Sequence, residues 1–295
     1  MKGDIKALQQ RIKTVGATKK IASVMRLIAS SKYQTYHKLL ISANEYNRHL
    51  TRVAHDYFQN IDLPPDIYKP ALFNNKPSNK VLLVCISSNK GLCGNFNQLI
   101  NNNIDSFIEI NKNKEISAFT IGAKAEKHIQ TKHKSDVMLI PHKCSLTKNP
   151  KYEHFVTMAS LIANFFLCEK FESVHMIFSH FVSSVERKVV SEILLPIPQP
   201  PTQKEYSVTA YEPSSHGIIE NLSWQMLKSK LYQNMISNYV SEHCARMLAM
   251  DNASKNASDI SDRLMLECNS MRQDGITTEL LEIIAGSETI KKNNI

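Results

Sequence analysis

The sequence predicts an α/β protein with two long helices. We expect an antiparallel two-helix coiled coil formed by the N- and C-terminal segments, together with a central α/β domain. Three observations predict this fold class: all eleven prolines lie between Pro64 and Pro213, the two chain ends carry opposite net charge, and only the middle alternates strand-like with helix-like runs. The predicted domains are residues 1–60, 61–213 and 214–295.

The distribution of proline permits long helices at both ends. A proline inside a helix costs about 3 kcal/mol, so segments without proline are free to form unbroken helices. At about 1.5 Å per residue, the C-terminal helix would be about 100 Å long, which is too long for one globular core to surround.

Charge favours pairing of these two helices with each other. Residues 1–56 carry eleven Lys and Arg against three Asp and Glu, whereas residues 217–290 carry six against ten. Opposite charge favours this pair over self-association of either helix. A second interpretation is two amphipathic helices that lie on a globular core, and the pattern alone is compatible with both.

Apolar residues recur at steps of three and four along both ends, as a helix interface requires. We expect changes of phase between blocks, and therefore an irregular supercoil. The predicted interface residues near the N-terminus are Ile5, Leu8, Ile12 and Val15, then Ile21, Met25 and Ile28, then Tyr36, Leu39, Ala43, Tyr46, Leu50, Val53 and Tyr57. Those near the C-terminus are Trp224, Leu227, Leu231, Val240, Cys244, Met247, Ala257, Ile260, Leu264, Cys268 and Met271.

The middle of the chain alternates strands with helices, which is typical of a mainly parallel sheet covered by helices. The longest apolar uncharged window, His154–Cys168, has 15 residues. A membrane span needs about 20, so we expect a buried helix there. The predicted strands are 81–86, 116–121, 174–182 and 185–195, and the predicted helices are 95–110, 123–129 and 155–171.

The segment GLCGNFN, residues 91–97, follows the first predicted strand and raises the question of a phosphate site. It matches neither GxxxxGK[ST] nor GxGxxG, because its two glycines are spaced GxxG and Lys90 precedes them. We therefore expect Gly91 and Gly94 to form a tight turn, with Asn95 or Asn97 capping the next helix.

Other chemistry is sparse, and we predict no catalytic, cofactor-binding or metal-binding residue. A zinc site built from His128, His133, His142 and Cys144 is disfavoured by their spacing and by nearby lysines. The hydroxyl-rich segment 179–184 has no motif for an activated nucleophile. The six cysteines are scattered without a CxxC pair, as expected for reduced thiols. No signal or transit peptide is visible at the N-terminus.

Three segments together resemble one known family. They are "IKALQQRIKTVGATKKIASVMRLIASSKY" near the start, "SSNKGLCGNFN" after the first strand, and "YVSEHCARMLAMDNASKNASDI" with "ITTELLEIIAG" near the end. In order and separation they resemble the gamma subunit of the rotary ATP synthase. Asn89, Lys90, Asn95 and Ser287 depart from residues usual in that family.

The resemblance implies a two-helix shaft, a Rossmann-like middle domain without a nucleotide site, and a rotor that is not itself catalytic. It implies as partners the alpha and beta subunits of a catalytic hexamer, the epsilon subunit and a membrane c-ring. It also implies a peripheral location on the cytoplasmic face of a bacterial inner membrane. The positions that match the family's partner interface are Met25, Arg246, Arg272, Gln273, Thr277 and Glu279.

Two other function classes are compatible with parts of the sequence. The net charge of +9, with its basic N-terminal segment, is compatible with a coiled-coil protein that binds nucleic acid, although no base-reading motif is visible. The α/β middle is compatible with a nucleotide-dependent enzyme. Binding to duplex DNA, or nucleotide binding by the middle segment, would distinguish these alternatives from a rotor.

Overall fold

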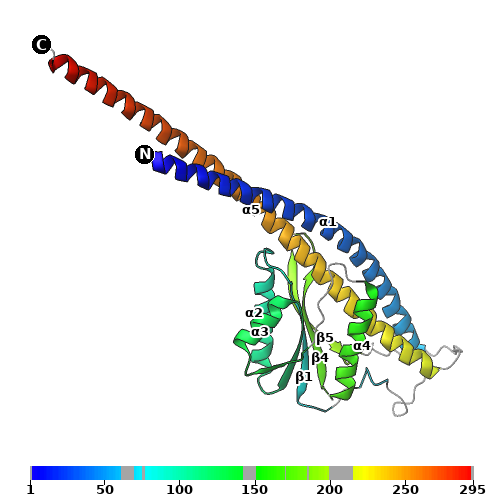
Figure 1. Ribbon diagram of the computed structural model, residues 1–295. Coiled ribbons are helices and arrows are strands. Elements are labelled where there is room, and N and C mark those ends of the chain that lie inside the picture. Colours follow the sequence, from blue (N-terminus) through cyan, green and yellow to red (C-terminus); the bar gives the residue numbers. More distant parts are fainter. Residues whose placement is uncertain are drawn as a thin grey trace. The chain divides into compact units, whose positions relative to one another are not determined.

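The computed structural model describes residues 2–60, 70–74, 77–141, 151–169, 171–184, 186–198 and 215–293 (Figure 1). The order of elements confirms the predicted fold class. The helices are α1 (Lys2–Asn60), α2 (Phe96–Ile110), α3 (Ala123–Lys132), α4 (Tyr152–Cys168) and α5 (Ser215–Asn293). The strands are β1 (Lys80–Ile86), β2 (Glu115–Ile121), β3 (Val137–Leu139), β4 (Ser173–Phe181) and β5 (Arg187–Leu195).

The described chain packs as two compact units, each treated by itself below. One consists of Met1–Ala29 with Met247–Ile295, and the other is Ser30–Arg246. We call the first the terminal unit and the second the sheet unit.

The sheet unit is built on a five-stranded sheet of order β3-β2-β1-β4-β5. Strands β1, β2, β3 and β4 pair in parallel, and β5 pairs antiparallel to β4. The short strand β3 was not predicted, because three residues are too few to show a period. The remaining strands fall where the sequence predicted them.

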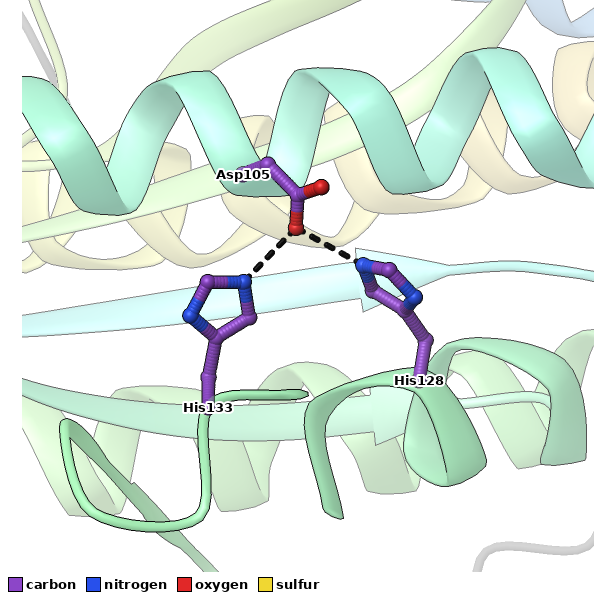
Figure 2. Close-up of side chains that lie close together, drawn as sticks. All are labelled: Asp105, His128 and His133. Carbon is purple, nitrogen blue, oxygen red and sulfur yellow. Dashed lines mark hydrogen bonds and ion pairs between the residues drawn. The ribbon is translucent and has the colours of Figure 1, made fainter. Parts of the chain in front are cut away.

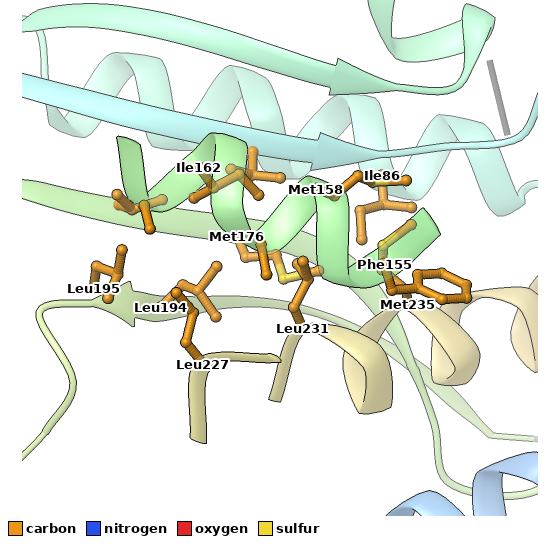
Figure 3. Close-up of a cluster of buried hydrophobic side chains, with 14 of the residues drawn as sticks. Ile86, Phe155, Met158, Ile162, Met176, Leu194, Leu195, Leu227, Leu231 and Met235 are labelled. Carbon is orange, nitrogen blue, oxygen red and sulfur yellow. The ribbon is translucent and has the colours of Figure 1, made fainter. Parts of the chain in front are cut away.

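Helices cover both faces of this sheet (Figure 1). Alternate residues of β1 point to opposite faces, so Leu82, Val84 and Ile86 join one core and Val81, Leu83 and Cys85 the other. The first core contains α4 and α5, and Figure 3 shows their side chains meeting over β4 and β5. The second core contains α2 and α3. The window 154–168 therefore forms a buried helix, as predicted.

In the sheet unit α1 and α5 run antiparallel. The Tyr36 ring stacks on Tyr239, and Asn47 donates a hydrogen bond to Gln233 at 2.9 Å, so positions rise along α1 as they fall along α5. In the terminal unit the order is the same, since Lys19 contacts Ser258 and Arg26 contacts Asp251. The antiparallel helix pair is thus present in both units.

The predicted interface of α1 is confirmed in part, since Leu8, Tyr36, Ala43 and Tyr57 are buried. Ile21 and Ile28 are exposed, whereas Ala22 and Ala29 are buried. The positions at the interface recur every seven residues without a change of phase: Leu8, Val15, Ala22, Ala29, Tyr36, Ala43, Leu50 and Tyr57, of which Val15 and Leu50 are half-buried and the rest buried. The larger residues Leu39, Tyr46 and Val53 are exposed. The prediction was wrong at these five exposed positions because it followed large apolar residues, while a close helix pair accepts alanine.

The C-terminal half of α5 shows the same regularity within the terminal unit. Met250 and Ala257 are buried, and Leu264 and Met271 are half-buried at the same seven-residue spacing. Ile260, predicted at the interface, is exposed. A strict seven-residue repeat favours a regular left-handed supercoil, contrary to the irregular one that was predicted.

Candidate functional site

The six predicted interface residues fall in both units. Met25 is half-buried on α1 of the terminal unit, and Arg246 is buried on α5 at the end of the sheet unit. The other four residues, Arg272, Gln273, Thr277 and Glu279, are all exposed on α5 of the terminal unit. The structure thus places five of the six in one unit.

The four exposed residues occupy two different faces of α5. Gln273 and Thr277 are four positions apart and share one face, and the Thr277 hydroxyl donates to the Gln273 carbonyl at 3.0 Å. Arg272 and Glu279 are seven positions apart and share a second face, about 130° around the helix from the first. Apolar side chains surround them, since Ile276, Leu280, Leu281, Ile283 and Ile284 are also exposed.

Arg246 is held inside the sheet unit. Its side chain is only 9% exposed, and its guanidinium donates to a Glu242 carboxylate oxygen at 2.7 Å. It also donates to the backbone carbonyls of Lys90 at 3.3 Å and Gly91 at 3.5 Å. Arg246 therefore ties α5 to the glycine loop that follows β1.

Burial shifts the pKa values of Glu242 and His243, which lie beside Arg246. Burial raises the pKa of Glu242, although Arg246 acts in the opposite direction. Burial, with Arg246 and Lys32 nearby, lowers the pKa of His243 to about 4. His243 is therefore neutral at pH 7. Its ring stacks on Tyr36 with centroids 5.5 Å apart, and its Nδ1 lies 3.4 Å from Arg246.

The glycine loop forms a tight turn, as predicted, but only one of the two predicted glycines adopts the left-handed conformation. Gly94 has φ +60°, as expected of a glycine at a turn, while the second left-handed residue is Leu92 at +63° and not Gly91. The Asn95 side chain does not cap α2. Asn97 instead accepts hydrogen bonds from the backbone N–H and the hydroxyl of Ser88. Both predicted capping interactions were thus wrong.

Helix α3 also begins beside the carboxyl ends of β1 and β2. Its first backbone N–H groups donate hydrogen bonds to acceptors within the chain. The first N–H, of Ala123, donates to the Asn89 side chain, and that of Lys124 donates to the Ser88 carbonyl. That of Ala125 donates to the Ser87 hydroxyl at 2.8 Å. These are the donors that a phosphate would need. Their internal partners argue against a nucleotide site at this turn.

A cluster of Asp105, His128 and His133 lies between α2 and α3 (Figure 2). The Nε2 atoms of both histidines are 2.7 Å from the same Asp105 oxygen, Oδ1, and Lys132 contacts the other oxygen at 2.5 Å. Although partial burial raises the pKa of Asp105, hydrogen bonds from Lys132, His128 and His133 lower it to about 2. Of the zinc ligands weighed earlier, His142 and Cys144 lie outside the described residues. The carboxylate was missed, because it lies on another helix.

Comparison with known proteins adds the decisive observation. The family model described as ATP synthase matches residues 4–290, nearly the whole chain. The chain belongs to the ATP synthase gamma chain family.

Curated members of the gamma chain family match over nearly their full length. The ATP synthase gamma chain of Geotalea uraniireducens is 31% identical over 97% of this chain and 99% of its own length. That of Ehrlichia canis is 32% identical over the same fractions. The family assignment therefore applies to the terminal helices and to the sheet together.

Solved ATP synthase structures share the fold. One is the Euglena gracilis mitochondrial ATP synthase, OSCP/F1/c-ring, with TM-score 0.64, 16% identity and coverage of 98% of this chain and 95% of that chain. Another is the central stalk and c-ring of the Tetrahymena thermophila enzyme, with TM-score 0.56, 20% identity and coverage of 79% and 99%. At these identities the likeness concerns the fold.

Membership of the gamma chain family helps to decide between a rotor and a nucleic-acid-binding protein. The matched proteins are ATP synthase chains, which gives no support to the nucleic-acid-binding interpretation. Within the described residues, no helix combines the length and the apolar character needed to cross a membrane.

Proposed function

We propose that this chain is the central rotor shaft of a proton-translocating ATP synthase. It couples proton flow through a membrane c-ring to conformational cycling of catalytic subunits that make ATP, and in reverse it is turned by ATP hydrolysis. The observation that carries the proposal is the family match over residues 4–290, which includes both helices of the antiparallel pair. The chain carries torque, and the chemistry belongs to its partners.

The proposed partners are the alpha and beta subunits of a catalytic hexamer, the epsilon subunit and the c-ring. The family assignment supports them, as do the matched structures, which are assemblies of F1, the c-ring and the central stalk. We retain residues 1–60 and 214–295 as the shaft and 61–213 as the domain that binds epsilon and the c-ring. The proposed location is peripheral, on the cytoplasmic face of a bacterial inner membrane.

Exposed apolar side chains on the terminal unit support the proposal that a ring of partner subunits surrounds it. On α1 these are Ile21, Val24, Leu27 and Ile28, and on α5 they cluster between residues 276 and 284. Contiguous apolar surface of this kind marks a partner interface. A hexamer of catalytic and non-catalytic subunits is the partner that the proposed function requires.

The mechanism follows from asymmetry. A shaft made of two unlike helices presents a different surface to each of three identical catalytic subunits, and so biases each toward a different conformation. Moving such an equilibrium from one side to the other takes about 5.5 kcal/mol of differential contact energy. Rotation then changes which subunit binds nucleotide tightly.

Within this mechanism we assign roles to the matched residues. Met25 and Arg246 are proposed to face an acidic lever of the catalytic subunit, and Arg272 and Gln273 to hydrogen-bond one of its loops, with Thr277 and Glu279 in the same interface. The exposure of the last four supports this. A partner carboxylate at Arg246 would have to compete with Glu242, which lies 2.7 Å from the guanidinium.

The deciding experiment is reconstitution with the alpha and beta subunits from the same source. The hexamer is fixed to glass, a bead is attached through a cysteine introduced in the sheet unit, and ATP is added. We expect stepwise rotation in one direction. Assembly into the complex without rotation would show a static stalk and would overturn the proposed function.

A further inference from the structure

The geometry points to a divalent metal site, best suited to Zn²⁺, formed by Asp105, His128 and His133 in the sheet unit. Asp105 lies on α2, His128 lies on α3, and His133 caps the end of α3. A bound ion would join the two helices that cover one face of the sheet. This inference does not depend on the proposed function.

The three side chains already point at one place (Figure 2). Each histidine Nε2 lies 2.7 Å from Asp105 Oδ1, and the three candidate ligand atoms lie within 4.8 Å of one another. In a tetrahedral zinc site with bonds of about 2.1 Å, ligand atoms are about 3.4 Å apart. The side chains would therefore shift by less than about 1 Å to admit the ion.

The cluster is partly buried, yet an ion in solvent can still reach it. The side chains of Asp105, His128 and His133 are 21%, 20% and 10% exposed. His133 is also fixed by its backbone, because its N–H donates to Ile129 and its carbonyl accepts from Asp136 and Val137. Ligands positioned before the ion arrives lose little conformational freedom when it binds.

One feature of the surroundings suits metal binding. A second carboxylate, Asp136, lies 3.9 Å from His133 Nδ1, on the far side of that ring. If its oxygen moves to within about 3 Å, this carboxylate can accept a hydrogen bond from Nδ1–H and leave Nε2 free for the ion, as carboxylates behind metal-bound histidines do.

Lys132 is the competing cation. Its ammonium contacts Asp105 Oδ2, so Oδ1 remains the oxygen that faces the histidines. Because the Lys132 side chain is 57% exposed, it can move into solvent when an ion binds. Two imidazoles and one carboxylate, completed by one water, form a four-coordinate set that suits Zn²⁺.

The test uses the purified full-length chain and Zn²⁺ or Co²⁺ alone. We expect one equivalent of Zn²⁺ to bind by calorimetry. Co²⁺ should give the visible bands of a four-coordinate ion without a thiolate charge-transfer band, which excludes the cysteines. At a free Zn²⁺ concentration of 100 times Kd, the melting temperature should rise by about 5 °C or more.

His128→Gln should weaken binding by at least about tenfold, and Asp105→Asn by a similar factor. His49→Gln is the matched control, because His49 is 66% exposed on α1 and also lies beside a carboxylate, that of Glu45. It should bind like the parent chain. If the parent chain does not bind Zn²⁺ stoichiometrically, the cluster only joins α2 and α3 by hydrogen bonds. Equal binding by His128→Gln and His49→Gln would place the ion elsewhere. Either result overturns the proposal.

A second measurement needs no variant and remains decisive if the variants do not fold. Diethyl pyrocarbonate modifies accessible imidazole nitrogens, and mass spectrometry locates the modified residues. Zn²⁺ should protect His128 and His133 but not His49. Equal modification of His128 and His133 with and without Zn²⁺ would contradict the assignment.

Discussion

Among single residues, Arg246 shows how a charge is accommodated in the core of the sheet unit. Its guanidinium has a carboxylate partner, Glu242, and two backbone carbonyls of the glycine loop. A buried charge left without its partner is far more costly than the intact pair is beneficial. The position therefore matters for stability as well as for any contact with a partner.

Arg246→Ala should destabilise the full-length chain by about 3–5 kcal/mol, because it leaves the Glu242 carboxylate buried without compensation. The measurement is urea unfolding at pH 7. Arg263→Ala, an exposed arginine on the same helix, is the control and should change stability by less than about 0.5 kcal/mol. Equal effects of the two substitutions would show that the buried pair is unimportant.

Arg246→Met combined with Glu242→Leu should recover most of the stability lost in Arg246→Ala, since apolar groups of similar volume replace the whole pair. The same unfolding assay measures it. Failure of the double variant to recover stability would mean that the contacts to Lys90 and Gly91, and not the pairing with Glu242, hold this region together.

His243 predicts a pH dependence of known sign. Its folded pKa of about 4 lies below the ordinary value of 6.5, so the unfolded chain binds more protons between these values. Stability should therefore fall as the pH is lowered from 6.5 toward 4, by up to about 3 kcal/mol from this residue. Denaturant unfolding at several pH values should show a weaker dependence for His243→Gln. Parallel curves for parent and variant would contradict the assignment.

At the scale of elements, the connections around the sheet depend on a few backbone conformations. Gly122, between β2 and α3, has φ +109°, and a Cβ there would lie 2.3 Å from the Ser87 carbonyl oxygen. Gly91 has open space around it. The two glycines therefore differ sharply in what they tolerate.

Gly122→Ala should destabilise the chain by more than about 2 kcal/mol, because it combines backbone strain with a clash against backbone atoms. Gly91→Ala should be neutral or stabilising by up to about 1 kcal/mol, since alanine restricts the unfolded chain without a clash. Thermal unfolding of both variants checks this contrast. Unchanged thermal stability of Gly122→Ala would contradict the expected clash with the Ser87 carbonyl.

The helix pair depends on small residues on α1. Ala29 is 1% exposed at the seven-residue interface, whereas its neighbour Ile28 is 58% exposed. Ala29→Leu should cost about 1–3 kcal/mol by overpacking, and Ile28→Ala should change stability by less than about 0.5 kcal/mol in the isolated chain. Unfolding midpoints decide between this interface and the predicted one, which would give the opposite ranking.

At the scale of the whole molecule, stability and coupling should be separable. Met25 is half-buried on α1, where a long flexible lysine can extend toward solvent. Met25→Lys should therefore fold and assemble, yet place a positive charge beside the proposed acidic lever. We expect a lower ratio of ATP made to protons moved in reconstituted vesicles, with near-normal thermal stability. A normal coupling ratio would remove Met25 from the interface.

Much of this molecule was determined by the sequence itself. Proline placement, end-to-end charge asymmetry and the period of apolar residues are local properties, and they predicted both long helices and the order of the longer strands. The motifs that carry the family resemblance are also local runs. The six proposed interface residues come from the family resemblance alone, and their roles stay predictions.

Tertiary structure alone decided the rest, because it depends on pairs of residues far apart in the chain. The face of α1 that forms the helix interface contains Ala22 and Ala29. Packing against a close neighbour buries these alanines, although their hydrophobicity does not distinguish them in the sequence. Arg246 meets the glycine loop more than 150 positions away, and Asp105 meets two histidines of another helix. Such contacts are set by how helices pack on a sheet, and local sequence does not encode them separately.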